Sequence, residues 1–307
     1  MRQRVVLRIT AAQKKGMTCG ETEDPLRRMR MKRVAVLFCF LALTLLVAPR
    51  ASATIYTLTD ENSVLSVNAT DPSGAGAYAW TVNGRNFLYQ QWFWFRIGST
   101  GGEASLNTLG NLTATQSSPD ALQLEYNDDN LGATGLEAEV KYTVTGAAPG
   151  IWTSDVSEII KLINHNSSAI TLHFFQYSDF DLRADRVDVV NIAADHRSVT
   201  QVPYGRLGPM LNETVLTPAP SRAEAGYWPN TLTSLNNATP TTLNNVLSAG
   251  PGDVTWAFEW DVTIAGHGGT FTISKDKNFQ PVPEPATLGL LGGILVVLAR
   301  KLRSYAV

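Results

Sequence analysis

Short runs of alternating apolar and polar residues recur about every ten residues between residues 54 and 280. A period of two is typical of strands that bury one face, and sustained helical patterns are scarce in this segment. The segment therefore predicts an all-β fold, either a β-sandwich or a jelly roll. The expected strands are Ile55–Leu58, Leu65–Asn68, Tyr78–Val82, Phe87–Ile97, Ala121–Tyr126, Leu136–Thr145, Ala169–Phe180, Val187–Ile192 and Val254–Ile264 pairing with Thr270–Ser274.

The last two of these strands form the clearest expected hairpin. Apolar residues alternate regularly through Val254–Ile264 before Gly266-His267-Gly268-Gly269 reverses the chain. The segment Asp155–Ile163 fits both a helical and a strand spacing, and we favour a strand that ends in a turn over residues 164–168.

Between Pro218 and Pro251 the chain is rich in Pro, Asn, Thr and Ser. This composition predicts a long surface connection, with a short helical turn near Leu243–Leu247. Since no repeat of solenoid or propeller period is visible, residues 54–280 are expected to form one domain.

The N-terminal 53 residues resemble a signal peptide with an extension ahead of it. A basic cluster from Met29 precedes the apolar run Val34–Val47, and the small residues Ala51 and Ala53 follow. The run is short for a membrane span, and small residues suit a signal peptidase, so we expect cleavage after Ala53. The alternative is a permanent anchor helix.

The C-terminal segment, residues 281–307, has three unlike elements in a fixed order. Pro283-Glu284-Pro285 is followed by the apolar run 286–299 and then by the basic residues Arg300, Lys301 and Arg303. Fourteen helical residues cover about 21 Å of a hydrocarbon core about 30 Å thick. This transmembrane helix is therefore expected to be a temporary anchor. The basic residues act as a stop-transfer signal that stays in the cytoplasm.

This tail resembles the PEP-CTERM sorting signal of Gram-negative bacteria, which is also catalogued as the C-terminal region of ice-binding proteins. The resemblance implies that an exosortase recognises Pro283, Glu284 and Pro285 and removes the helix. It also implies an inner-membrane-anchored intermediate that is later released or reattached at the cell surface, in association with exopolysaccharide and biofilm. The match covers about 25 residues and implies nothing about the domain ahead of it.

Charge is unevenly distributed along the chain. Residues 54–280 contain 23 Asp and Glu against 11 Lys and Arg, a difference of −12. An acidic surface argues against nucleic acid as a partner. Both cysteines, Cys19 and Cys39, lie ahead of the expected cleavage point, so the domain has neither a disulfide nor a thiolate metal site.

Two acidic clusters are candidates for a calcium site, because calcium prefers several oxygen ligands. One is Asp179-Phe180-Asp181, which continues to Asp185 and Asp188, and the other is Asn127-Asp128-Asp129-Asn130. Residues 179 and 181 share one face of the expected strand. A solvated turn also explains either cluster, and we favour it, so calcium is the one cofactor left open.

Seven tryptophans and the stretch Gln90-Gln91-Trp92-Phe93-Trp94-Phe95 suggest sugar stacking. Trp92 and Trp94 project from one face of the expected strand, so they are the candidate ligand-binding residues. The alternative, which we favour, is that both are core residues.

No motif of a nucleophile elbow, a phosphate-binding loop, a zincin or an EF-hand occurs in the domain. The histidines His165, His173, His196 and His267 have no metal-like spacing, so no catalytic residue is assigned.

Taken together, these patterns predict a non-enzymatic, exported protein of the cell surface or extracellular matrix. It would serve the exopolysaccharide layer as a structural or adhesive component, with signal peptidase and exosortase as processing partners. The first alternative is a lectin-like polysaccharide-binding domain. The second is an extracellular glycan hydrolase, whose two carboxylates need not be close in sequence.

Overall fold

The computed structural model describes residues 54–70, 76–127, 134–205 and 207–281. The expected signal-cleavage residues, the sorting motif Pro283-Glu284-Pro285, the basic tail and the anchor helix 286–299 lie outside these residues, as does most of the acidic cluster 127–130. Within the described ranges, no helix has the length and apolar character needed to cross a membrane.

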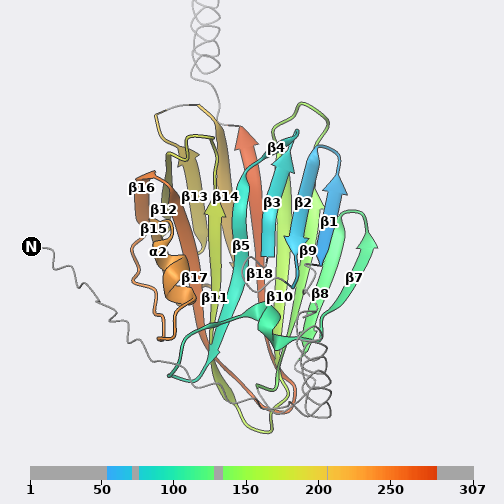
Figure 1. The fold of residues 1–307 in the computed structure, drawn as a ribbon, viewed down its shortest axis with the longest axis vertical. Coiled ribbons are helices and arrows are strands. Elements are labelled where there is room, and N and C mark those ends of the chain that lie inside the picture. Colours follow the sequence, from blue (N-terminus) through green and yellow to red (C-terminus); the bar gives the residue numbers. More distant parts are fainter. Residues whose placement is uncertain (1–53, 71–75, 128–133, 206, 282–307) are drawn as a thin grey trace, which may run out of the picture. The chain divides into compact units, whose positions relative to one another are not determined.

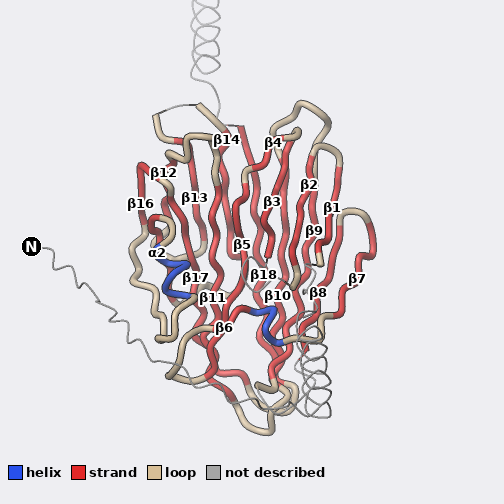
Figure 2. Tube along the Cα trace, in the orientation of Figure 1, coloured by secondary structure: helices blue, strands red, loops and turns tan. Residues whose placement is uncertain are grey.

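The described residues form two antiparallel sheets that pack face to face, confirming the all-β, sandwich-like prediction (Figure 1). Strands make up most of these residues, with two short helical segments, η1 (Leu106–Leu109) and α2 (Asn230–Leu235) (Figure 2). Sheet A has the order β1 (Ile55–Asp60), β2 (Ser63–Asn68), β3 (Gly76–Val82), β5 (Leu88–Ile97), β11 (Ile170–Phe180), β17 (Val254–Ile264) and β15 (Arg222–Tyr227), with β4 (Arg85–Asn86) beside β3 and β6 (Ala104–Ser105) beside β5. Sheet B has the order β16 (Ser248–Gly252), β12 (Asp188–Ile192), β13 (Ser198–Pro203), β14 (Pro209–Thr217), β18 (Gly269–Pro281), β10 (Ser154–Asn164), β9 (Leu136–Thr145), β8 (Ala121–Asn127) and β7 (Thr113–Ser118).

The core between the sheets is rich in aromatic rings. Phe180 and Trp256 of sheet A stack with ring centroids 5.3 Å apart, and Trp80 packs on Phe279 of sheet B at 4.5 Å. Large aromatic side chains bury much apolar area per residue, which suits a domain that has no disulfide.

The core also contains a group of four charged residues, Glu158, Glu213, Lys275 and Lys277, which we call the core ion cluster. All four side chains are at most 2% exposed. Both lysines bond to Glu158, and the Nζ atom of each lies 3.3 Å from Oε1 of Glu213. Two negative and two positive charges therefore neutralise one another inside the sandwich.

The strand prediction for Asp155–Ile163 is confirmed by β10, but the expected hairpin of the last two strands is wrong. β17 pairs with β11 and β15 in sheet A, whereas β18 pairs with β10 and β14 in sheet B. The turn between them is a corner that crosses from one sheet to the other. The buried side chain of Asn164 holds this corner, because its Nδ2 donates to Ile264 O and Ala265 O at 3.1 and 3.0 Å. Alternation shows which side chains face the core but not which strand lies alongside.

The prediction of a surface connection over residues 218–251 is wrong at both ends, where β15 and β16 lie, whereas residues 228–247 do connect these two strands. This stretch contains β15, α2 and β16, and Leu243–Leu247 is not helical. β16 escapes detection because Ser248–Gly252 is rich in Gly and Pro, which are depleted in strands. Residues 228–247, which we call the strap, lie over sheet A, since Asn236 Oδ1 accepts a bond from Trp94 Nε1 at 3.2 Å.

Candidate functional site

The outer face of sheet A, the face directed away from sheet B, carries a row of polar residues across three strands. Arg96 on β5, His173 on β11 and Asp261 on β17 are direct neighbours in the strand register. His173 alternates with Leu172 and Phe174, which are both buried in the core. The pleat of β11 therefore sends the imidazole to the outer face.

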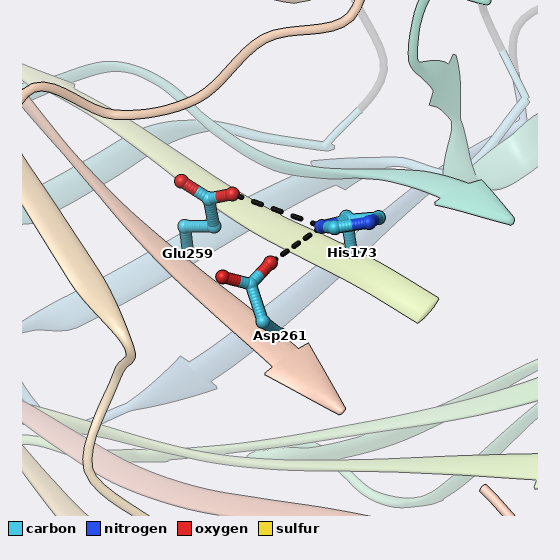
Figure 3. Close-up of side chains that lie close together, drawn as sticks. All are labelled: His173, Glu259 and Asp261. Atoms are coloured by element: carbon cyan, nitrogen blue, oxygen red, sulfur yellow. Dashed lines mark hydrogen bonds and ion pairs between the residues drawn. The ribbon is translucent and has the colours of Figure 1, made fainter. Parts of the chain in front are cut away.

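His173 contacts two carboxylates through one ring nitrogen (Figure 3). Its Nδ1 lies 2.5 Å from Oδ1 of Asp261 and 3.9 Å from Oε1 of Glu259, two residues earlier on β17. The second ring nitrogen points away from both acids (Figure 3). A proton on Nδ1 shared with Asp261 leaves Nε2 with a lone pair, so the imidazole can act as a base at that atom.

The three side chains differ in their access to solvent. The side chains of His173 and Asp261 are 20% and 37% exposed, whereas that of Glu259 is 1% exposed. A ligand on the outer face can therefore contact His173 and Asp261, whereas Glu259 is buried beneath them.

Glu259 is poised to change charge near neutral pH. Burial raises the pKa of Glu259 to about 7, and the neighbouring Asp261 adds to the rise against a hydrogen bond from the Leu243 N–H. Such a carboxyl exchanges a proton readily under physiological conditions, which is a property of acid–base sites. Its ionisation adds negative charge beside His173.

The strap holds this site in place from above. Leu243 N donates to Oε2 of Glu259 at 2.8 Å, and Arg96 Nη2 donates to Thr241 O at 3.2 Å. Arg96 also pairs with the buried carboxylate of Glu103 at 3.0 Å. The guanidinium is fully engaged within the protein, so we assign Arg96 a positioning role.

A cleft of about 580 Å³ lies where β5 ends and β11 begins, and His173, Glu259 and Asp261 are not among the residues that line it. Polar groups of Arg96, Thr100, Ser167 and Asn166 and the apolar side chains of Phe95 and Ile97 are among the residues that line it. A cavity of this size and mixed polarity suits a small polar ligand.

The tryptophans singled out from the sequence are not on an exposed platform. Trp92 is fully buried and Trp94 is 3% exposed. The Nε1 atom of Trp92 donates to Ser105 Oγ at 3.0 Å, and that of Trp94 is bonded to the strap. Neither ring is free to stack on a sugar.

The structure gathers part of one predicted acidic cluster. Asp179 and Asp181 lie with Asp253, and carboxylate oxygens from the three residues are within 4.8 Å of one another. Asp188 belongs to a different environment, because its Oδ2 accepts bonds from Leu182 N and Gln201 Nε2 at 3.1 and 2.8 Å.

No pattern in the sequence indicates a role for His173, Glu259 or Asp261. The available signal was weak. Glu259 and Asp261 occupy alternate positions of β17, which is otherwise mostly apolar. His173 is likewise a polar residue between apolar ones in β11. Only the strand register reveals that β11 and β17 are neighbours.

No protein-family profile and no curated protein sequence matches this chain. Among solved structures, a putative aldose 1-epimerase from Escherichia coli K12 matches with a TM-score of 0.52 and 10% identity, covering 75% of this chain and 100% of that one. A galactose mutarotase related enzyme from Lactobacillus acidophilus and a galactose mutarotase-like protein from Lactobacillus casei each match at 8% identity and a TM-score of 0.46, covering 75% and 74% of this chain and 99% and 100% of theirs. The match to the Escherichia coli protein shows a shared fold.

This match overturns the expectation that the domain is not an enzyme. That expectation depended on the absence of short motifs, whereas the fold is shared with a protein described as a putative aldose 1-epimerase. Acid–base groups contributed by separate strands have no fixed spacing in the sequence, so a motif search does not detect them.

Proposed function

We propose that this domain binds an aldose on the outer face of sheet A and interconverts its anomers. The observation that carries the proposal is the His173–Asp261 pair, partly exposed above the buried Glu259. The fold shared with a putative aldose 1-epimerase supports the same substrate class.

Anomer interconversion needs proton transfer and no cofactor. A base takes the proton of the hydroxyl at C1, an acid protonates the ring oxygen, and the opened sugar closes again with either configuration at C1. His173 Nε2 is the proposed base, and the outward oxygen of Asp261, when protonated, is the proposed acid. Glu259 is a positioning residue whose carboxylate lies 3.9 Å from His173 Nδ1.

Hydrolysis of a glycan is less well supported. A glycosidase places two carboxyl groups on opposite sides of the bond, with about 5 to 9.5 Å between them. Glu259 and Asp261 instead lie on one strand, with the His173 nitrogen within reach of both.

The pH dependence of the reaction tests the proposal. Anomer exchange of glucose, galactose and related aldoses is measured by magnetisation-transfer NMR between about pH 5 and 9. We expect the rate to rise through about pH 7 as Glu259 ionises, and the Glu259→Gln variant to lose this rise while staying folded. A rate equal to that of buffer at every pH, for every aldose, contradicts the proposal.

We further propose that the domain acts outside the cytoplasm. The N-terminal leader and the Pro283-Glu284-Pro285 tail support export and exosortase sorting to the cell surface, where exopolysaccharide offers sugar. Deleting residues 283–307 should move the protein from the envelope to the medium. Retention of the truncated protein in the envelope argues against this address.

A further inference from the structure

We propose that Lys275 and Glu158 condense inside the core to form an intramolecular amide cross-link between β18 and β10, with Glu213 as the proton carrier. Glu158 and Lys275 are direct partners in the antiparallel register of these two strands. Lys275 Nζ contacts Glu158 Oε2, and the two side chains are 0% and 1% exposed. The fold therefore holds an amine and a carboxyl group in contact and shields them from solvent.

The two lysines of the core ion cluster differ in how their surroundings set their charge. Burial lowers the pKa of Lys275 to about 8, even though Glu158 beside it acts in the opposite direction. Burial also acts to lower the pKa of Lys277, but Glu158 and Glu213 outweigh it and raise that pKa above its usual range. Lys275 is therefore the lysine that can supply an uncharged amine, whereas Lys277 keeps its charge.

The cross-link forms by a condensation that needs only proton transfers between the residues of the cluster. A proton passes from the Lys275 ammonium to the Glu158 carboxylate, and the amine nitrogen then attacks Cδ of Glu158 and forms the C–N bond. Positive charge develops on this nitrogen, and Glu213 Oε1, 3.3 Å from Lys275 Nζ, accepts one of its protons. Glu213 returns that proton to the departing Glu158 oxygen as the C–O bond breaks. One ammonium and one carboxylate thereby become one amide and one water molecule.

Two hydrogen-bond donors lie beside the carboxyl group that is attacked. Lys277 Nζ is 2.5 Å from Glu158 Oε1, so its positive charge stabilises the negative charge that this oxygen gains during the attack. Tyr142 lies directly opposite Glu158 in the β9–β10 register and is fully buried, and its hydroxyl has no hydrogen-bond partner within the described residues.

The unpaired hydroxyl of Tyr142 is an independent sign of the amide, because buried hydroxyls usually have a partner. In the carboxylate, each oxygen of Glu158 already contacts a lysine. In the amide, Lys275 no longer bonds to a Glu158 oxygen, and the carbonyl oxygen has a lone pair for Tyr142.

The condensation leaves the charges of the core balanced. One positive and one negative charge disappear together, and Lys277 remains with Glu213, whose Oε1 lies 3.3 Å from its Nζ. Removing a buried ion pair also removes the cost of keeping two charges out of water. Groups that a fold holds in contact react as if at an effective concentration on the order of 10⁵ M or more, which favours the amide over its hydrolysis.

The amide closes a covalent loop from residue 158 to residue 275. It ties β18, the last strand of the domain, to β10 in the middle of sheet B. A covalent loop of this kind limits the freedom of the unfolded chain, as a disulfide does. The cross-link therefore braces a domain whose described residues contain no cysteine.

Mass spectrometry tests the cross-link on wild-type protein that shows cooperative thermal unfolding and is then denatured. We expect the mass of the chain to be lower than that of its sequence by one water molecule. Proteolysis should release the peptides that contain Glu158 and Lys275 as one joined species. Glu139 and Lys161 are an internal control, because they too are direct partners on adjacent strands, with Lys161 Nζ 2.8 Å from Glu139 Oε1, but are partly exposed. Their peptides should be released separately.

Three variants test the assigned roles. Lys275→Arg keeps a positive charge but lacks the primary amine, so its mass should equal that of its sequence. Glu213→Gln keeps the shape of the proton carrier but cannot carry the proton, so the joined fraction should fall at least about tenfold. His173→Gln should be joined as fully as the wild type, because the cross-link does not depend on the His173 site.

A folded wild-type protein with the full mass of its sequence overturns the proposal. A joined peptide pair that persists in Lys275→Arg also overturns it, because another lysine would then be the nucleophile. Anomer exchange is measured on the same samples, so failure of the cross-link and failure of the proposed function are distinguished.

Discussion

Replacing Glu213 by alanine removes one of the two carboxylates from the core ion cluster. The Glu213 side chain is fully buried between the sheets. It accepts hydrogen bonds from Gln176 Nε2 at 2.8 Å and from Trp256 Nε1 at 2.9 Å, besides its contacts with Lys275 and Lys277. The variant leaves two buried ammonium groups with only Glu158 as a partner.

The loss of stability expected for Glu213→Ala follows from the charged partners of this carboxylate. Burial alone would raise the pKa of Glu213, but Lys277, Lys275 and the two hydrogen bonds hold it at about 2. Against an ordinary value of 4.5, this corresponds to about 3 kcal/mol in favour of the charged form. This value agrees with the about 3 to 5 kcal/mol of stability that is typically lost when one partner of a buried ion pair is removed. The stabilisation is present above about pH 4.5 and is lost as pH falls towards 2.

Urea unfolding at pH 7 measures this cost. We expect Glu213→Ala to lower the free energy of unfolding by about 3 kcal/mol or more. Glu213→Gln keeps the shape but loses the charge, so it should also be destabilising. The matched control is Glu139→Ala, which breaks a partly exposed pair with Lys161 and should change stability little. Equal stabilities for Glu213→Ala and Glu139→Ala would show that the core ion cluster does not stabilise the fold.

Three further changes test other parts of the structure. Gly76→Ala should severely destabilise the domain, because the new Cβ would lie 2.3 Å from the Gln91 carbonyl oxygen. Gly84 also has a positive φ but faces open space, so Gly84→Ala should lower the free energy of unfolding in urea by only about 1 kcal/mol. Asn164→Ala should lower the melting temperature by several degrees, since it removes buried hydrogen bonds at the corner between the sheets, and an unchanged value would count against that role. Asp179→Asn should stabilise the protein more at pH 8 than at pH 5, because burial raises the pKa of Asp179 to about 7 and its ionisation in the folded state then favours unfolding as pH rises. Equal effects at both pH values would contradict this.

The fold class was readable from the sequence because burial of one strand face leaves a period of two. Most long strands appear as expected, including β9, which spans Leu136–Thr145 as predicted. Strand partners were not readable. Val254–Ile264 and the next strand are adjacent in sequence yet belong to different sheets, and the hydrogen bonds of Asn164 that fix this arrangement have no local signature.

The candidate site was also not predicted, because it depends on which strands are neighbours. His173 and Asp261 are 88 residues apart in the chain and meet only through the register of β11 and β17. The aromatic stretch around Trp92 looked like a ligand platform because it is dense in tryptophan, but the strap and β6 cover that face. Composition shows which side chains are present, whereas coverage by distant segments decides which of them are accessible.

If His173 transfers a proton to and from a sugar, its replacement must slow anomer exchange. The most direct test compares anomer exchange by the wild-type protein, His173→Gln and His165→Gln at equal concentration. His165 is a matched control, because it also pairs with a carboxylate, Glu137, at 2.7 Å but lies outside the site. We predict that His173→Gln lowers the exchange rate at least about 100-fold while His165→Gln leaves it unchanged. Equal rates for wild type and His173→Gln would contradict the claim.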